Sequence, residues 1–353
     1  MTTVGQPPER FRPVGVALFG YGAWGGNHAR VLSSTGDARL SGIVEPDPER
    51  REAARAAHPD VPVWRDAAAA LRDPEVEAVV VATPAHTHAR VAEEVVTAGR
   101  HVLVEKPFAT RGRDAQQVAR RARAAGVVSM AGHTFLYAQP VLNIARILRE
   151  GLLDAPVFVR SERLGSRRRA DCGALWNLAP HDVSILLYLL DSPVAEVSAR
   201  SHVFRSGGSA GHDDATSVDL TFESGAAAAV QVSWRSAGKR RALSVLGETW
   251  SMEYLNRSGG DHLALDCGPA TADQDALRQL LYEGCELADG GVRYREPLQA
   301  EVEHFARCCR TGETPRTGAR HAIETARVLE AAERSASEGG APVRLAAGKE
   351  LAA

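Results

Sequence analysis

Short apolar runs alternate with polar, helix-forming segments through the first part of the chain. The runs are rich in β-branched and aliphatic residues, which favours buried parallel strands covered on both faces. The segments between them have helix start and stop signals such as an early proline or a final glycine. This alternation predicts a doubly wound parallel α/β sheet. The predicted strands are Val14–Phe19, Leu40–Val44, Val61–Trp64, Ala78–Ala82, His101–Val104 and Val127–Gly132.

The first of these runs ends in a glycine-rich turn with the spacing GxGxxG of a dinucleotide-binding fingerprint. In that fingerprint the first glycine permits a tight turn, the second lets the backbone approach a pyrophosphate, and the third lets helix and strand pack closely. The phosphates are expected on the free N–H groups of the helix that follows. The candidate cofactor residues of the turn are Gly20, Tyr21, Gly22, Ala23, Trp24 and Gly25.

An acidic residue ends the second predicted strand. Glu45, 25 positions after Gly20, is placed to accept hydrogen bonds from the adenosine ribose, and its charge repels the extra phosphate of NADP. NAD is therefore the expected cofactor and NADP is disfavoured. Ligands of such sheets lie beyond the carboxyl ends of the strands. The further cofactor candidates that follow later strands are Thr83, Pro84, His88, Glu105 and Lys106.

Lys106 is also a candidate catalytic residue, expected close to the nicotinamide of the bound cofactor. Only three of the 42 basic residues in the chain are lysines, so an ammonium at this edge of the sheet is unusual. An ammonium can exchange a proton or polarise a carbinol or carbonyl oxygen, whereas a guanidinium keeps its proton. The alternative is a solvated surface charge. The composition favours a catalytic Lys106.

The second half of the chain has a different pattern. After a helix predicted over Val141–Glu150, strand-like runs follow one another with brief turns, which predicts a largely antiparallel open sheet. Its outer face is free to form a homodimer or homotetramer. We therefore divide the chain into a dinucleotide-binding domain, 1–132, and a substrate-binding and oligomerisation domain, 133–353. The predicted strands are Pro156–Glu162, Val194–Phe204, Ala215–Phe222, Ala226–Trp234, Arg241–Leu246 and Thr249–Leu255, with terminal helices Leu298–Arg310 and Gly318–Ser335 and a flexible loop Gly207–His212.

A polar cluster precedes an apolar helix predicted over Val183–Leu190. Pro180 suits the first turn of that helix, which places His181 near the positive end of the helix dipole and disfavours its protonation. A neutral imidazole near pH 7 is what a general base requires, so His181 is the second catalytic candidate. Asn177 and Asp182 are expected to orient the substrate or His181. A capping or core role is the alternative for this cluster.

Basic and aromatic side chains nearby are further substrate candidates. Arg163, with Arg167–Arg169, can bind a substrate diphosphate bidentately, although a solvated loop is an equally good interpretation. Tyr137 and Trp176 can line a sugar site, and simple core packing is the alternative for both.

Composition excludes several classes of function. The 353-residue chain has a formal net charge of −2, which gives no basis for binding nucleic acid or an anionic membrane. Its N-terminal segment lacks the apolar core of a signal peptide, so a cytoplasmic protein is expected. The five cysteines have no metal-ligand spacing, and we expect no disulfide and no metal site.

The sequences of these motifs resemble those of the Gfo/Idh/MocA oxidoreductases. The resemblance rests on GYGAWG, on VVVATPAHTHARVAEEVVTAGRHVLVEKPFAT with its Glu-Lys-Pro, and on LWNLAPHDVSILLYLL. It implies an N-terminal NAD(P)-binding Rossmann domain and a C-terminal α/β domain whose open sheet often forms the oligomer interface. It also implies that His181 acts as the acid/base. Asn177 stands where this family commonly has an aspartate, so the chain departs from the majority pattern there.

The sequence therefore predicts an NAD(P)-dependent oxidoreductase that moves a hydride between nicotinamide and a secondary alcohol or ketone of a small-molecule sugar. The resemblance is strongest to nucleotide-sugar and amino-sugar 3-dehydrogenases and 3-ketoreductases, which implies carbon 3 of a nucleotide-linked or amino sugar. An aminoglycoside, free-sugar or inositol dehydrogenase stays open. Outside enzymes, the alternative is a dinucleotide-sensing regulatory protein, which has no need of a proton relay.

Overall fold

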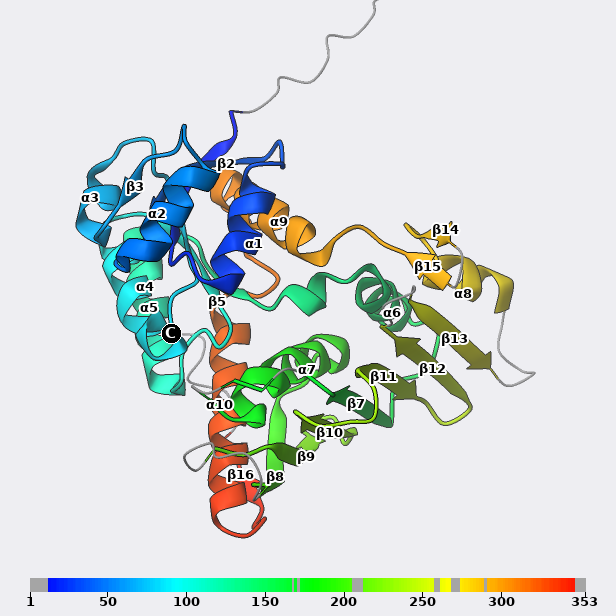
Figure 1. Cartoon of the computed structure of the whole chain (residues 1–353). Coiled ribbons are helices and arrows are strands. Elements are labelled where there is room, and N and C mark those ends of the chain that lie inside the picture. Colours follow the sequence, from blue (N-terminus) through cyan, green and yellow to red (C-terminus); the bar gives the residue numbers. More distant parts are fainter. Residues whose placement is uncertain are drawn as a thin grey trace, which may run out of the picture.

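The computed structural model describes residues 12–166, 168–169, 172–204, 212–256, 261–267, 274–288 and 291–346. Arg167 and residues 207–211 of the predicted flexible loop lie outside the described residues. Two sheets, joined by long helices, make up the fold (Figure 1). In the described part of the chain, no helix combines the length and apolarity needed to cross a membrane.

The first sheet, sheet A, has six described strands in the order β3-β2-β1-β4-β5-β6, and every neighbouring pair is parallel. All residues of the central β1 are buried, because helices cover both of its faces. The strand order reverses between β1 and β4, which is where doubly wound sheets bind ligands. The predicted parallel sheet is thus confirmed. Its strands are β1 (Val14–Phe19), β2 (Ala38–Val44), β3 (Val63–Trp64), β4 (Ala78–Val81), β5 (His101–Glu105) and β6 (Ser129–Gly132).

Helices from both ends of the chain cover sheet A. One face packs on α1 and α9, and Val302 and Phe305 of α9 are fully buried in that core. The other face packs on α4, α5 and the first turns of α10, including Ala322. The C-terminal helices therefore complete the core of the N-terminal sheet. The helices are α1 (Ala23–Leu32), α2 (Pro48–Ala57), α3 (Ala67–Arg72), α4 (His88–Thr97), α5 (Gly112–Ala125), α9 (Pro297–Thr311) and α10 (Ala319–Ser337).

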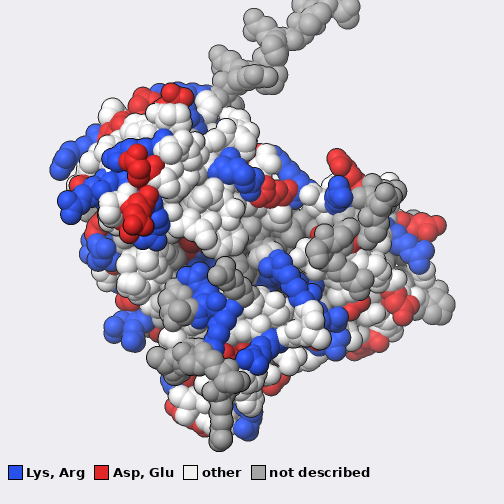
Figure 2. Space-filling view, in the orientation of Figure 1, with Lys and Arg blue, Asp and Glu red and all other residues white. Residues whose placement is uncertain are grey.

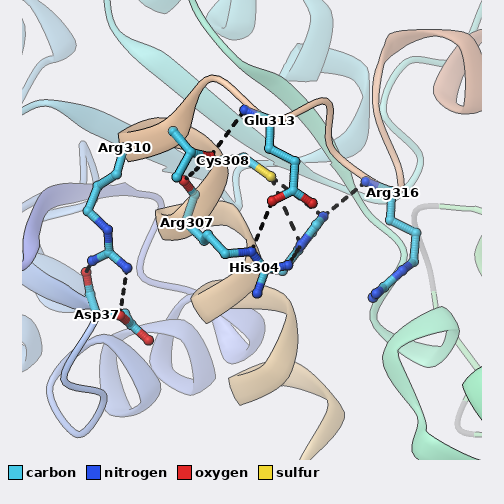
Figure 3. Close-up of polar contacts among 8 residues, drawn as sticks. Asp37, His304, Arg307, Cys308, Arg310, Glu313 and Arg316 are labelled. Atoms are coloured by element: carbon cyan, nitrogen blue, oxygen red, sulfur yellow. Dashed lines mark hydrogen bonds and ion pairs between the residues drawn. The ribbon is translucent and has the colours of Figure 1, made fainter. Parts of the chain in front are cut away.

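Polar contacts anchor the turn between α9 and α10 (Figure 3). Arg310, at the end of α9, donates a hydrogen bond of 2.7 Å to the carboxylate of Asp37, just before β2. The Nε2 atom of His304 lies 3.0 Å from the backbone N–H of Arg316, which donates to it. These contacts hold the end of α9 against sheet A, so that α10 starts beside the same sheet.

The second sheet, sheet B, has eight described strands in the order β13-β12-β11-β7-β10-β9-β8-β16. Its neighbouring pairs are antiparallel except β7 and β10, which run parallel because β7 is inserted between β10 and β11. The largely antiparallel sheet predicted from the sequence is confirmed. Its strands are β7 (Phe158–Leu164), β8 (Val194–His202), β9 (Ala215–Phe222), β10 (Ala227–Ser233), β11 (Arg240–Leu246), β12 (Trp250–Leu255), β13 (His262–Cys267) and β16 (Val343–Arg344).

One face of sheet B is covered by α6 (Gln139–Arg149), α7 (Ala174–Leu190) and α10. The long α10 thus packs against both sheets and joins them (Figure 1). Helix α8 (Gln274–Leu281) and the small hairpin of β14 (Glu286–Ala288) and β15 (Gly291–Arg293) extend the far end of sheet B and were not expected from the sequence. The carboxyl ends of the strands of sheet A face helix α7, because Lys106, directly after β5, contacts Asn177 of α7. We call this region between the two sheets the junction.

Candidate active site

Two glycines of the turn after β1 are required by packing. Gly20 has φ +95°, and a Cβ there would lie 2.7 Å from the carbonyl oxygen of Ala82. A Cβ on Gly25 would lie 2.1 Å from the carbonyl oxygen of Gly20. Larger residues at either position would push α1 away from β1 or β4.

Gly22 differs from these two, because a Cβ there would meet no protein atom within 4 Å. It is the N-cap of the ten-residue α1, which has no side-chain cap and no acidic residue in its first turn. The N-terminal N–H groups of α1 therefore face open space with the positive end of the helix dipole behind them. This arrangement fits the pyrophosphate of a dinucleotide.

The carboxylate of Glu45 is held beside the glycine turn. Only 3% of the residue is exposed. Its two oxygens accept the backbone N–H groups of Tyr21 at 2.7 Å and Asp47 at 3.0 Å. The acid is thus fixed at the carboxyl end of β2, adjacent to the N-terminus of α1, where the ribose of a bound dinucleotide fits.

Glu105, a cofactor candidate from the sequence, serves instead to join β5 to α1. One of its oxygens lies 2.8 Å from Nε2 of His28, and the other accepts the backbone N–H of Lys106 at 3.0 Å. Burial raises the pKa of Glu105, but the hydrogen bond and charge of His28 outweigh it and hold that pKa below its ordinary value. His28 was not predicted as a site residue from the sequence. Its position three residues after Gly25, on the buried face of α1, is the feature that could have indicated it.

His88 also needs correction, because the protein itself occupies both of its ring nitrogens. They lie 2.8 Å from the carbonyl oxygens of Pro107 and Thr83. Burial lowers the pKa of His88. The residue therefore ties the loop after β4 to the loop after β5 and has no ring nitrogen left for a cofactor. Pro84, in the first of these loops, is exposed at the edge.

Lys106 reaches across the junction to α7. Its Nζ donates to the carbonyl oxygen of Asn177 at 2.7 Å and to the Oδ1 of the same residue at 2.9 Å. Burial lowers the pKa of Lys106 to about 8, against the charge of Glu105, which raises it; the nearby Arg169 lowers it further. The carboxyl end of sheet A thus holds a half-buried ammonium whose hydrogen-bond partners on α7 are neutral.

His181 lies one helical turn after Asn177, in the interior of α7. The helix begins at Ala174, so the prediction that Pro180 occupies the first turn is wrong. The helix dipole therefore does not keep His181 neutral. Burial is the main cause of a pKa well below 6.5, followed by the charges of Lys106 and Arg163. The Nδ1 of His181 is buried without a hydrogen-bond partner among the described residues.

Asp182 and Arg163 bind each other rather than facing a substrate. Arg163 donates from Nε at 3.0 Å and from Nη2 at 3.1 Å to the two oxygens of Asp182. Ser161 also donates to Asp182, at 2.7 Å. Both partners of the ion pair are buried. This ion pair joins α7 to β7. The sequence predicted that Asp182 orients the substrate and that Arg163 binds a diphosphate bidentately. Both predictions are corrected, because the two side chains bind each other in this way.

Tyr137 and Trp176 pack in or against the hydrophobic core, which was the alternative to their role in a sugar site. Tyr137 is 2% exposed, its hydroxyl lies 3.2 Å from Oγ1 of Thr317, and the guanidinium of Arg316 lies over its ring. Trp176 packs against the core beneath sheet B and donates from its indole N–H to Glu333 of α10 at 3.0 Å. Neither ring is directed at Lys106 by these contacts, so we withdraw both as substrate residues.

Two further histidines, one buried and one half-buried, were not predicted from the sequence. His133 follows β6, is 1% exposed, and has no hydrogen-bond partner for either ring nitrogen among the described residues. Its ring lies 5.6 Å from that of His321, whose Nε2 is 2.7 Å from Oγ of Ser184. Burial lowers the pKa of His133 well below 6.5 and that of His321 to about 4. The charge of Lys106 also lowers the pKa of His133, which puts this imidazole at the junction.

Two family models match the chain. Residues 14–133 match an oxidoreductase family with an NAD-binding Rossmann fold, and residues 141–253 match the Gfo/Idh/MocA C-terminal domain. Together these segments cover more than half of the sequence, and they include the glycine turn, Lys106 and α7.

Known proteins of this kind align along almost the whole chain. The D-apiose dehydrogenase of Paraburkholderia graminis is 29% identical over 92% of this chain and 88% of its own. The WlbA dehydrogenase from Bordetella pertussis, solved with NADH and UDP-GlcNAcA, superposes with a TM-score of 0.82 at 23% identity, over 96% of this chain and 100% of its own. GenD2 from gentamicin A biosynthesis, solved with NAD, has a TM-score of 0.76 at 25% identity, over 98% and 100%.

The glycine geometry predicts different outcomes for two alanine variants. Gly22→Ala should weaken NADH binding by about tenfold or more, because the new methyl group keeps the pyrophosphate from the helix N-terminus. Its thermal unfolding should change little. Gly25→Ala should lose binding and also lower Tm by several degrees, since overpacking at a main-chain contact costs about 1–3 kcal/mol. NADH fluorescence titration and thermal unfolding measure the two effects; equal loss of Tm in both variants would contradict the assignment of Gly22.

Proposed function

The chain belongs to the Gfo/Idh/MocA family of oxidoreductases, and on that premise we propose that it is an NAD-dependent sugar dehydrogenase or ketoreductase. It interconverts a secondary alcohol and a ketone, with carbon 3 of a nucleotide-linked or amino sugar as the favoured position. The observation that carries the proposal is the contact of Lys106 with Asn177. This contact brings a half-buried ammonium from the carboxyl end of sheet A to a residue one helical turn before His181.

The cofactor assignment rests on the glycine turn and Glu45. The N-terminus of α1 would hold the pyrophosphate, and the fixed carboxylate of Glu45 would accept the ribose hydroxyls. A 2′-phosphate beside that carboxylate would be repelled, so we propose NAD rather than NADP. When bound, the nicotinamide supplies a site that accepts or returns a hydride.

Lys106 and His181 divide the handling of charge at the substrate oxygen. During oxidation His181, neutral at pH 7, takes the hydroxyl proton, and protonated Lys106 stabilises the negative charge that develops on that oxygen. In the reverse direction His181 returns the proton. Asn177 positions the ammonium without neutralising it, because an amide carries no charge.

Two relatives support a sugar as the substrate, namely the D-apiose dehydrogenase at 29% identity and GenD2 from gentamicin A biosynthesis at 25%. The likeness to GenD2 favours an aminoglycoside as the second candidate. Direction of reaction is left to experiment, since one site serves both directions.

We also propose that the outer face of sheet B forms a homodimer or homotetramer interface. That face has a shallow hollow whose lining includes the apolar Phe158 and Leu246 and the charged Arg160 and Glu253. Phe158 is 37% exposed in the single chain. Burying such a surface against a second copy would remove apolar area from water.

The direct test is a substrate panel read by NADH absorbance. We expect NAD-linked turnover with one class among UDP-sugars, dTDP-keto sugars, aminoglycosides and inositols. The ketone forms are assayed with NADH and the alcohols with NAD, which also determines the direction. Binding of NADH without turnover of any member would contradict an enzymatic role of this kind.

Substitution of the two proposed catalytic groups separates chemistry from cofactor binding. Lys106→Ala and His181→Ala should each lower kcat by about 10²- to 10⁴-fold, the usual contribution of a positioned acid or base. NADH affinity should stay within about twofold, because neither residue touches the glycine turn. His262→Ala, which removes an exposed histidine of β13, is the matched control. Full activity in Lys106→Ala or His181→Ala would remove that residue from the mechanism.

The pH dependence of kcat/KM should report the ionisation of Lys106. Because the proton on Lys106 is required and its pKa is about 8, kcat/KM for oxidation should be steady near pH 7 and fall as pH rises through about 8. Asn177→Asp places a carboxylate on the ammonium, which should move that falling limb upward by about one unit or more. Circular dichroism at each pH checks that the fold persists. An unmoved limb in Asn177→Asp would show that another group titrates.

A further inference from the structure

Two arginines face each other on neighbouring strands of sheet B, close to the candidate active site. Arg163 of β7 and Arg241 of β11 are direct cross-strand partners in an antiparallel pair. Their guanidinium carbons lie 4.5 Å and 4.7 Å from the centroid of the Phe135 ring. Like charges directly opposite on a sheet repel each other, so this arrangement costs stability unless an anion compensates it.

Among the described residues, Arg163 forms an ion pair with Asp182, whereas Arg241 forms none, although the charge of Asp182 raises the pKa of Arg241. The guanidinium of Arg241 makes one hydrogen bond to the described residues, a long one of 3.3 Å to the neutral Oδ1 of Asn256, whose own amide donates to Asp261. The Nη1 of Arg163 and the Nε of Arg241 are buried without a partner among the described residues. Two guanidinium nitrogens close to the Phe135 ring are therefore unpaired among the described residues.

Arg163 and Arg241 lie close to His181, the proposed base. The His181 ring lies 4.7 Å from the centroid of Phe135, the ring on which both arginines stack. Burial lowers the pKa of Arg241 to about 10, and the charge of Arg163 lowers it further. The charge of Arg241 is in turn the main cause of a lowered pKa at Lys239. Arg163 and Arg241 therefore both lie beside the proposed base. Figure 2 shows that Lys and Arg side chains also gather on the surface in the middle of the face drawn there, below the domain of sheet A.

We propose that Arg241, with Arg163 behind it and Lys239 beside it, binds an anionic group of the substrate, a carboxylate or a phosphate. The inference rests on the proposed function, because it assigns the substrate class of that same site. An anion placed there pairs the unpartnered guanidinium nitrogens and relieves the repulsion between the two strands. The substrate is then an acidic or phosphorylated sugar rather than a neutral polyol.

The test compares ligands that differ only in charge on NADH-loaded protein, so that the glycine turn is already occupied. The probes are D-glucuronate against D-glucose, UDP-N-acetylglucosaminuronate against UDP-N-acetylglucosamine, and inorganic pyrophosphate, titrated calorimetrically into wild type and Arg241→Gln. Arg240→Gln is the matched control, because Arg240 is the adjacent residue of β11, is exposed, and pairs with Glu162 on the opposite face of the sheet. Both variants lose one positive charge.

We expect at least one anionic probe to bind wild type and Arg240→Gln about 10- to 100-fold more tightly than Arg241→Gln, the range for losing one charge-assisted hydrogen-bonding group. The sugar-acid pairs report a carboxylate, whereas binding of both UDP-sugars and pyrophosphate reports a phosphate. Arg241→Lys, which keeps the charge, should retain part of the affinity and guards against misfolding of the glutamine variant.

Two results would overturn the subsite. One is that no anionic probe distinguishes wild type from Arg241→Gln. The other is that D-glucose, the uncharged probe, binds wild type as tightly as the anionic probe of highest affinity. NAD-linked oxidation of a neutral sugar in the substrate panel would leave the proposed function standing while removing the anion subsite.

Discussion

The hydrogen bonds from Lys106 to Asn177 are the contact on which the candidate site depends. They connect the ligand-binding edge of sheet A with the helix that carries His181. The ammonium is half-buried there against a carbonyl and an amide, and its pKa of about 8 leaves it charged at neutral pH but able to lose its proton near pH 8. Because α10 packs on both sheets, the two halves of the site are held at a set separation.

Buried carboxylates at the junction are used to hold elements in place. Glu105 links β5 to α1 through His28, and Asp182 links α7 to β7 through Arg163. Each acid is paired, as burial of a charge requires. Among the described residues, the buried side-chain atoms without a partner include Nε of Arg241, both ring nitrogens of His133 and one oxygen of Glu301. The junction therefore has unsatisfied hydrogen-bonding groups that a polar ligand could pair.

Much of the fold was predictable from local signals. The apolar runs marked the strands of sheet A, because strands buried on both faces must be apolar throughout. The glycine turn was recognisable because Gly20 and Gly25 meet backbone atoms that exclude a side chain. The start of α7 was not predictable in this way: Pro180 is a helix-start signal, yet it lies inside the helix, where the packing of α7 on sheet B outweighs the lost hydrogen bond.

The sequence by itself determined the parallel and antiparallel sheets, the dinucleotide turn, and the choice of Lys106 and His181 as reactive candidates, since each follows from periodicity or from a residue type that the chemistry needs. Only the tertiary structure decided which charges are paired. Asp182, Glu105 and His88 were candidate site residues, but partners from other segments already satisfy them, and Asp182 also holds two nitrogens of Arg163. Spacing along a chain carries no record of such contacts, because ion pairs and desolvation are set by which surfaces the fold brings together.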